Sequence, residues 1–168
     1  MLTATKSLQA LTAADLMSTD VVMIPQAMSL RSAAHRLAQA GISGAPVVDD
    51  DGCCVGVISA GDFVTWAEKG ERAAKQWPTE ACCVHSSWQV MAPEALPVEE
   101  VRCYMTSDPV TVSPVTTIME LARMMVDAGI HRVIVVDERE RPIGIVSSTD
   151  IIAAVAYGGG RPGEATPW

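Results

Sequence analysis

One segment of this chain occurs twice at a fixed spacing. The strings GVISAGD at 56–62 and GIVSSTD at 144–150 both run from a glycine through apolar residues and a serine to an aspartate, and the second begins 88 positions after the first. The strings AGI and VVD recur at the same spacing. Residues 17–62 therefore recur at 105–150 without insertion or deletion, which predicts two copies of one structural unit.

The residues before each VVD string predict an amphipathic helix. In TTIMELARMMVDAGI the apolar residues follow the spacing i, i+3, i+4, i+7, i+8, which places them on one helix face. Thr117 and Glu120 form a capping-box pattern at its start, and Gly129 is typical of a helix end. The first copy, SLRSAAHRLAQAG, has the same apolar spacing, with Ser29 as the cap and Gly41 at the end.

Two β-branched runs around a polar turn follow each helix. They read APVVD and CVGVIS around DDDG in the first copy, and RVIVVD and PIGIVS around ERER in the second, so each pair predicts two strands joined by a tight turn. An apolar segment precedes each helix, at 21–24 and 110–112, and a helical pattern follows each motif aspartate. The prediction is therefore an α/β (α+β) fold of two βαββα units. Because one unit alone buries a small core, we expect the two to pack with pseudo-twofold symmetry.

The repeat divides the chain into four regions. We expect the first repeat at 10–70 and the second at 101–157. Between them, residues 71–100 form an insertion rich in tryptophan and proline. The tail at 158–168, GGGRPGEATPW, is predicted to be flexible.

Composition excludes several classes of protein. No run of about 18 apolar residues is present, so no membrane span is expected, and the first residues lack the apolar stretch of a signal peptide. We therefore expect a cytoplasmic protein whose five cysteines are reduced thiols, since an odd number in adjacent pairs does not suit a disulfide framework. The net charge of −8 and the absence of a Lys/Arg cluster argue against nucleic acid as a partner.

The motif aspartates and serines have a chemistry that suits a nucleotide. A carboxylate at the start of a helix can accept hydrogen bonds from both hydroxyls of a ribose, and Asp62 and Asp150 have this position. A serine three residues earlier, with the helix N-terminus, could form a small phosphate site, and Ser59 and Ser147 fit it. The alternative is that each aspartate only caps its helix, which contributes roughly 1 kcal/mol.

The pattern VVD…GxxSxxD, with the preceding helix and its terminal glycine, resembles the CBS domain in its usual tandem pair, the Bateman module. The resemblance covers residues 10–157 apart from the insertion. It implies a regulatory module that binds an adenine nucleotide in the clefts between the repeats, with S-adenosylmethionine and NAD as alternative adenosyl ligands. It also implies a homodimer and an effector protein as partners. No cofactor is implied, and AMP, ADP and ATP are not ranked by the sequence.

The two clefts are predicted to be unequal. The resemblance to nucleotide-sensing CBS proteins implies that a GxHR string at this position reaches the phosphates of a nucleotide. This string occurs here only in the second copy, as His131 and Arg132. An exposed strand edge is the alternative role for this pair. The predicted nucleotide site comprises Met17, Val22, Ile42, Ser43, Ala45, His131, Arg132, Ser147, Thr149 and Asp150. The weaker cleft comprises Ser59, Asp62, Met105, Val110 and Ile130, with Gly61 in place of the second hydroxyl.

Other signals do not indicate catalysis. No catalytic triad, carboxylate pair or phosphate-binding P-loop is present, so an enzyme is not expected. The string CCVH at 82–85 lacks the C-x₂₋₄-C spacing of a zinc site, so no metal is expected either. A second hypothesis for function remains: a constitutive dimerisation or scaffold module with vestigial clefts, in which the insertion, with tryptophans at 77 and 88 after Trp66, contacts a partner.

Overall fold

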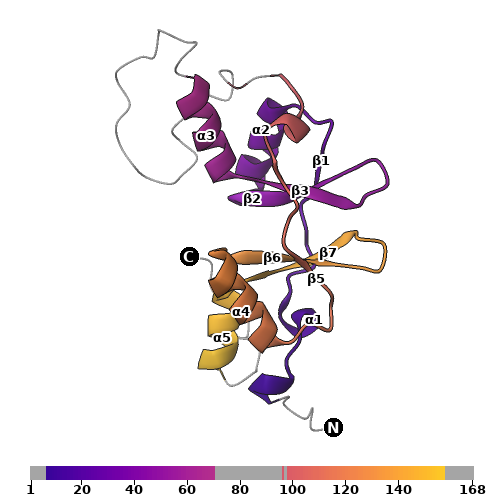
Figure 1. Ribbon diagram of the computed structural model, residues 1–168, viewed down its shortest axis with the longest axis vertical. Helices are drawn as coiled ribbons and strands as arrows, with labels where there is room; N and C mark the ends of the chain where they lie inside the picture. Colours follow the sequence, from indigo (N-terminus) through magenta and orange to yellow (C-terminus); the bar gives the residue numbers. More distant parts are fainter. Residues whose placement is uncertain (1–6, 71–95, 97, 158–168) are drawn as a thin grey trace. The chain divides into compact units, whose positions relative to one another are not determined.

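The computed structural model describes residues 7–70, 96 and 98–157. It contains two compact units, each described here by itself. The first-repeat unit comprises Val22–Pro109, and the second-repeat unit comprises Val110–Trp168 together with Met1–Val21. In each unit two helices lie on the same face of a small sheet (Figure 1). The predicted mixed α/β fold with a βαββα order in each repeat is confirmed.

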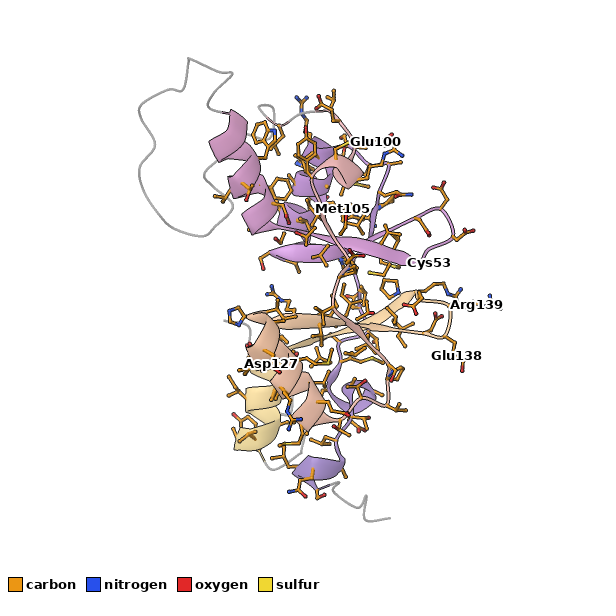
Figure 2. The ribbon with its side chains drawn as sticks, in the orientation of Figure 1. Cys53, Glu100, Met105, Asp127, Glu138 and Arg139 are labelled. Carbon is orange, nitrogen blue, oxygen red and sulfur yellow. The ribbon has the colours of Figure 1, made fainter. Side chains whose placement is uncertain are left out.

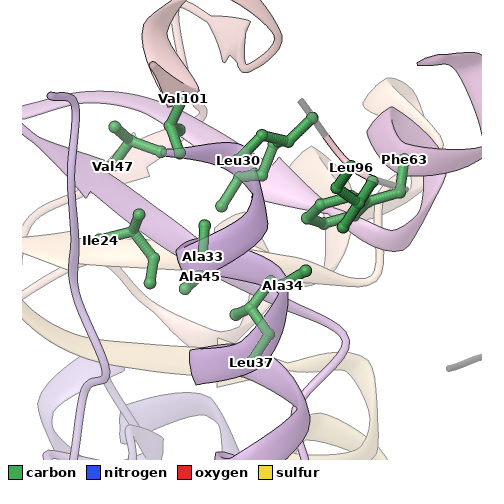
Figure 3. Packing of buried hydrophobic residues seen from close by; sticks show 11 residues of the cluster. Ile24, Leu30, Ala33, Ala34, Leu37, Ala45, Val47, Phe63, Leu96 and Val101 are labelled. Carbon is green, nitrogen blue, oxygen red and sulfur yellow. The ribbon is translucent and has the colours of Figure 1, made fainter. Parts of the chain in front are cut away.

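The first-repeat unit has a four-stranded sheet in the order β1-β2-β3-β4. Strand β1 (Ile24–Pro25) is parallel to β2 (Gly44–Val48), and β2, β3 (Cys54–Ser59) and β4 (Thr106–Ser107) are antiparallel. The helices are α2 (Leu30–Ala40) and α3 (Ala60–Gly70), and a 3-10 turn, η3, covers Val101–Cys103. The core lies between α2 and the sheet, where Ile24, Leu37 and Val47 are fully buried (Figure 3).

The second-repeat unit repeats this arrangement. Strands β5 (Thr111–Val112), β6 (Arg132–Val136) and β7 (Pro142–Ser147) form its sheet, and α4 (Ile118–Ala128) and α5 (Ser148–Ala156) cover it. Two short elements from the start of the chain, η1 (Leu8–Ala10) and α1 (Ala13–Leu16), also belong to this unit. The first strand of each repeat is two residues long, shorter than the apolar segment that predicted it. Each is an edge strand paired on one side only.

The predicted helix boundaries are confirmed by their caps. The Ser29 hydroxyl accepts a hydrogen bond from the Ser32 N–H, and Thr117 with Glu120 forms the complete capping box. The hydrogen bonds from Thr117 lower the pKa of the Glu120 carboxyl. Gly41 and Gly129 end α2 and α4 with φ of 65° and 63°, in the left-handed region that favours glycine.

The segment before each repeat packs on the other repeat. The N–H groups of Ala13 and Ala14 donate to the carbonyls of Thr116 and Pro114, at 2.8 and 2.9 Å. The equivalent bonds 88 positions later run from Val101 to Met28 and from Arg102 to Gln26, at 2.8 and 3.2 Å. Residues 8–18 therefore complete the second-repeat unit, and Leu96 with residues 98–107 completes the first.

This exchange explains the glycine that opens each repeated motif. A Cβ on Gly56 would lie 2.6 Å from Met105 Sδ and 2.9 Å from the Thr106 carbonyl oxygen, and a Cβ on Gly144 would collide with Met17. Both methionines belong to the exchanged segments (Figure 2 labels Met105). The glycine is therefore required by the close approach of a crossing chain, and neither Gly56 nor Gly144 has a positive φ.

A single methyl group at this position should be destabilising. We expect Gly144→Ala to lower the free energy of unfolding by about 1–3 kcal/mol, because the new Cβ has to displace Met17 from a packed core. Gly61→Ala is the matched control, since its new Cβ would meet only Ser59 Oγ, at 3.6 Å. Urea denaturation of both variants measures the difference, and equal stability of the two would contradict the packing role.

Candidate functional site

The predicted ribose and phosphate residues of the second repeat lie together at one end of the β6–β7 hairpin. Arg132, the first residue of β6, pairs with Ser147, the last residue of β7. The carbonyl of His131 accepts a hydrogen bond of 2.9 Å from the Ser148 N–H, in the first turn of α5. His131, Arg132 and Thr149 are exposed, and Asp150 is half-buried beside them. A histidine and an arginine thus stand next to a helix N-terminus that carries hydroxyls and a carboxylate.

Asp150 caps α5 with one carboxylate oxygen. Its Oδ2 accepts hydrogen bonds from the Ser147 N–H at 2.7 Å and from the Ser147 hydroxyl at 2.6 Å. The Asp150 N–H donates to Ser147 Oγ at 3.2 Å in return. The capping role considered from the sequence is therefore present. Among the residues that the structure describes, Oδ1 of Asp150 has no hydrogen-bond donor, so it can accept one from a ligand.

These hydrogen bonds also engage the Ser147 hydroxyl, which was predicted to contact a phosphate. Its hydroxyl both donates to Asp150 and accepts from the Asp150 N–H, so it positions the carboxylate. The Thr149 hydroxyl is exposed and has no partner among the described residues. Thr149 thus offers an exposed hydroxyl at this end of the hairpin.

The first repeat has the same frame with different side chains. Gly44 pairs with Ser59, and the Ser43 carbonyl accepts a 2.9 Å hydrogen bond from the Ala60 N–H. Asp62 Oδ2 accepts from the Ser59 N–H at 2.7 Å and from its hydroxyl at 2.8 Å. Ser43 and Gly44 replace the His-Arg pair, so no cationic side chain stands at these two positions.

One residue of this frame was missed by sequence reasoning. Oδ1 of Asp62 accepts a third hydrogen bond, of 3.1 Å, from the hydroxyl of Thr106 in β4. Thr106 is 44 positions away along the chain. Nothing in the motif pattern pointed to it, because the contact depends on the exchange of segments between repeats.

The predicted adenine contacts are divided between the two units. Met17 packs in the core of the second-repeat unit, against Gly144 of the strand that leads to Asp150. Ala45 is buried in β2 and is paired with Ile58 of β3. The other predicted residues are Val22, Ile42, Ser43 and Met105 in the first-repeat unit, and Val110 and Ile130 in the second-repeat unit. Their assembly into the two predicted clefts stays a prediction.

Signals from the cysteines and tryptophans lie elsewhere. Cys53 stands next to the β2–β3 turn (Figure 2), at the opposite end of the hairpin from Ser59. Trp66 of α3 packs against the first-repeat core. Within the described ranges no three His, Cys, Asp or Glu side chains are placed to hold a metal ion, and no described helix is long and apolar enough to cross a membrane. The CCVH string and the tryptophans at 77 and 88 lie outside the described residues.

Known proteins resemble this chain both in sequence and in structure. A homoserine O-acetyltransferase of Methanococcoides burtonii is 28% identical over 138 residues, which are 82% of this chain and 23% of that enzyme. The chain thus spans about a quarter of that relative's length.

Two solved structures share the fold. The CBS domain pair of protein MJ0100, in complex with 5′-methylthioadenosine and S-adenosyl-L-methionine, has a TM-score of 0.66 at 22% identity, over 88% of this chain and 97% of that one. CBSX2 of Arabidopsis thaliana, in complex with AMP, also has a TM-score of 0.66 at 22% identity, over 87% and 96%. The family model of the CBS domain matches residues 13–69 and 98–157. The chain therefore belongs to the CBS domain family, as a tandem pair.

Proposed function

We propose that this chain is a regulatory module that senses an adenine nucleotide through the second-repeat half-site. The observation that carries the proposal is Asp150, whose Oδ2 is fixed by Ser147 while Oδ1 faces no donor among the described residues. A carboxylate held in this way is oriented before it binds, so little entropy is lost when it accepts the hydroxyls of a ribose. The ligands named for MJ0100 and CBSX2 are adenosyl compounds, which supports this class of ligand.

The phosphate would be bound by groups that surround Asp150. Arg132 can make two parallel hydrogen bonds to phosphate oxygens, and a ring N–H of His131 can donate another. The Thr149 hydroxyl and the N-terminus of α5 supply further donors on the same side. A nucleotide should therefore bind more tightly than adenosine.

A thermal shift series tests the proposal. AMP, ADP, ATP, S-adenosylmethionine and NAD are each added to the wild-type chain, and the melting temperature is followed. A ligand at about 100 times its Kd should stabilise the fold by roughly 2.7 kcal/mol, which raises the melting temperature by about 10 °C or more for units of this size. No shift with any of the five would reject the sensing function and favour the scaffold hypothesis.

The regulatory step follows from linkage. A ligand that binds one arrangement of a two-state protein better than the other shifts their populations, and an effector protein that contacts one arrangement reads the shift. We propose this role rather than catalysis because the hydroxyl and carboxylate that are in contact in the half-site, those of Ser147 and Asp150, are engaged in capping α5. The chemistry named for the longer Methanococcoides relative belongs to that enzyme.

We also propose that the chain forms a homodimer through the second-repeat helices. Met119 and Val126, seven residues apart on α4, are 59% and 79% exposed, and Ile152 and Val155 of α5 are 66% and 59% exposed. The equivalent positions of α2 are Arg31 and Ala38. Several large apolar side chains on two adjoining helices are typical of a surface that a partner covers, and a second copy is the partner that we expect.

A substitution on α4 tests the dimer. Wild type should scatter light as twice the 17.8 kDa chain at micromolar concentration, and Val126→Asp should shift it toward the monomer, because a carboxylate would be buried in an apolar contact. Ala38→Asp, at the equivalent position of α2, should leave the dimer unchanged. A monomeric wild type would contradict the proposal.

A further inference from the structure

The two motif aspartates cap their helices in the same way but differ in their second oxygen. Oδ2 of each accepts hydrogen bonds from the N–H and hydroxyl of the motif serine. Oδ1 of Asp62 also accepts from the Thr106 hydroxyl at 3.1 Å, whereas Oδ1 of Asp150 has no donor in the described part of the chain. The difference lies on the oxygen that a ligand would have to reach.

The cause is a difference between the two exchanged segments. Thr106 pairs with Val57 in the β3–β4 ladder, and Ser18, 88 positions earlier, pairs with Ile145 in the same register. The backbone thus brings a hydroxyl-bearing residue to the same place in both units. The Thr106 hydroxyl reaches its aspartate, but the Ser18 hydroxyl makes no hydrogen bond among the described residues.

The chemistry of ribose recognition makes this difference decisive. A vicinal diol donates two hydrogen bonds to a carboxylate, and Asp150 can accept them while it keeps its cap. At Asp62 the Thr106 hydroxyl already occupies one of the two acceptor positions of Oδ1, so a diol can donate at most one hydrogen bond to that oxygen. In addition, Ser43 and Gly44 stand where the second repeat has the histidine and arginine that could bind a phosphate.

We infer that Thr106 is a specificity-determining residue, which engages Asp62 within its own chain and confines adenine-nucleotide binding to the half-site of Asp150. This inference rests on the proposed function. Asp62 then has a structural role, in which its hydrogen bond with Thr106 connects β4 to the first turn of α3. One chain should then bind one nucleotide, although both copies of the motif contain an aspartate.

The experiment is a calorimetric titration of AMP into the 168-residue chain and four variants. Wild type should bind one AMP per chain. Thr106→Val, which replaces the hydroxyl by a methyl group at an exposed position, should add a second event at least tenfold weaker than the first. Ser18→Val is the matched control and should keep a single event. Adding Asp62→Ala to Thr106→Val should remove the second event again.

The outcomes separate this inference from the proposed function. Two events in wild type, of which Asp62→Ala removes one, would overturn the inference and leave the sensing function in place. A single event in Thr106→Val would do the same. Absence of binding in wild type and in every variant would overturn the proposed function, and the inference with it.

Discussion

Ala13→Asp should unfold the second-repeat unit while the first-repeat unit stays folded. Ala13 is completely buried in the second-repeat core, although it precedes the first repeat in the sequence. An uncompensated buried charge costs about 3–5 kcal/mol, a large part of the 5–15 kcal/mol that stabilises a typical domain. Hydrogen exchange on the full chain should show lost protection at residues 110–157 and retained protection at 22–70.

Val101→Asp provides the reciprocal control. Val101 stands 88 positions after Ala13, is equally buried, and lies in the first-repeat core. Its substitution should remove protection from residues 22–70 and leave 110–157 protected. If each charge instead destabilised the repeat that is contiguous with it in sequence, or both units equally, the exchange of segments would be wrong.

The sequence predicted the local structure of each repeat well, because its signals act over a few residues. A capping box, a left-handed glycine and the apolar spacing of α4 are all satisfied within one helix. The hairpins follow from β-branched runs around a polar turn, where Asp137 accepts hydrogen bonds from Arg139 and Arg141. These bonds, led by that of the Arg141 side chain, lower the pKa of Asp137 to about 2.

The partner of each preceding segment could not be predicted in the same way. Residues 8–18 and 96–106 each stand directly before a repeat, and they are 88 positions apart. This spacing would be the same whether each segment packed on the repeat that follows it or on the other repeat. Leu11 and Val101 show by their patterns that they are buried, but an apolar pattern does not specify which of two similar cores receives them. The core that receives each segment is decided by contacts between residues far apart in the sequence.

The candidate site was predicted in part for the same reason. His131, Arg132, Thr149 and Asp150 come together because one hairpin and one helix start hold them, and both are local elements. The sequence could not show which carboxylate oxygens already accept hydrogen bonds within the chain. It depends on Thr106, which reaches Asp62 only because β4 is contributed from beyond the insertion.

Asp150→Ala should abolish measurable binding of both AMP and adenosine, because it removes the group that recognises the ribose. It also removes the helix cap, which costs about 1 kcal/mol of stability and could lower affinity indirectly. Asp62→Ala is therefore the control, since it removes the equivalent cap from α3. Equal loss of stability with binding lost only in Asp150→Ala would separate recognition from capping.

Arg132→Ala should discriminate between nucleotide and nucleoside. Loss of a charge-assisted, bidentate contact costs about 1.5–3 kcal/mol, so the Kd for AMP should rise roughly tenfold or more, while the Kd for adenosine should change little. Isothermal titration of the two ligands measures both. Arg132 is exposed at the start of β6, so its side chain is not needed for the core, and a parallel loss of adenosine binding would place it at the ribose instead. If Asp62→Ala rather than Asp150→Ala abolished AMP binding, the working half-site would be that of the first repeat, and the His-Arg pair would be part of an ordinary exposed strand edge.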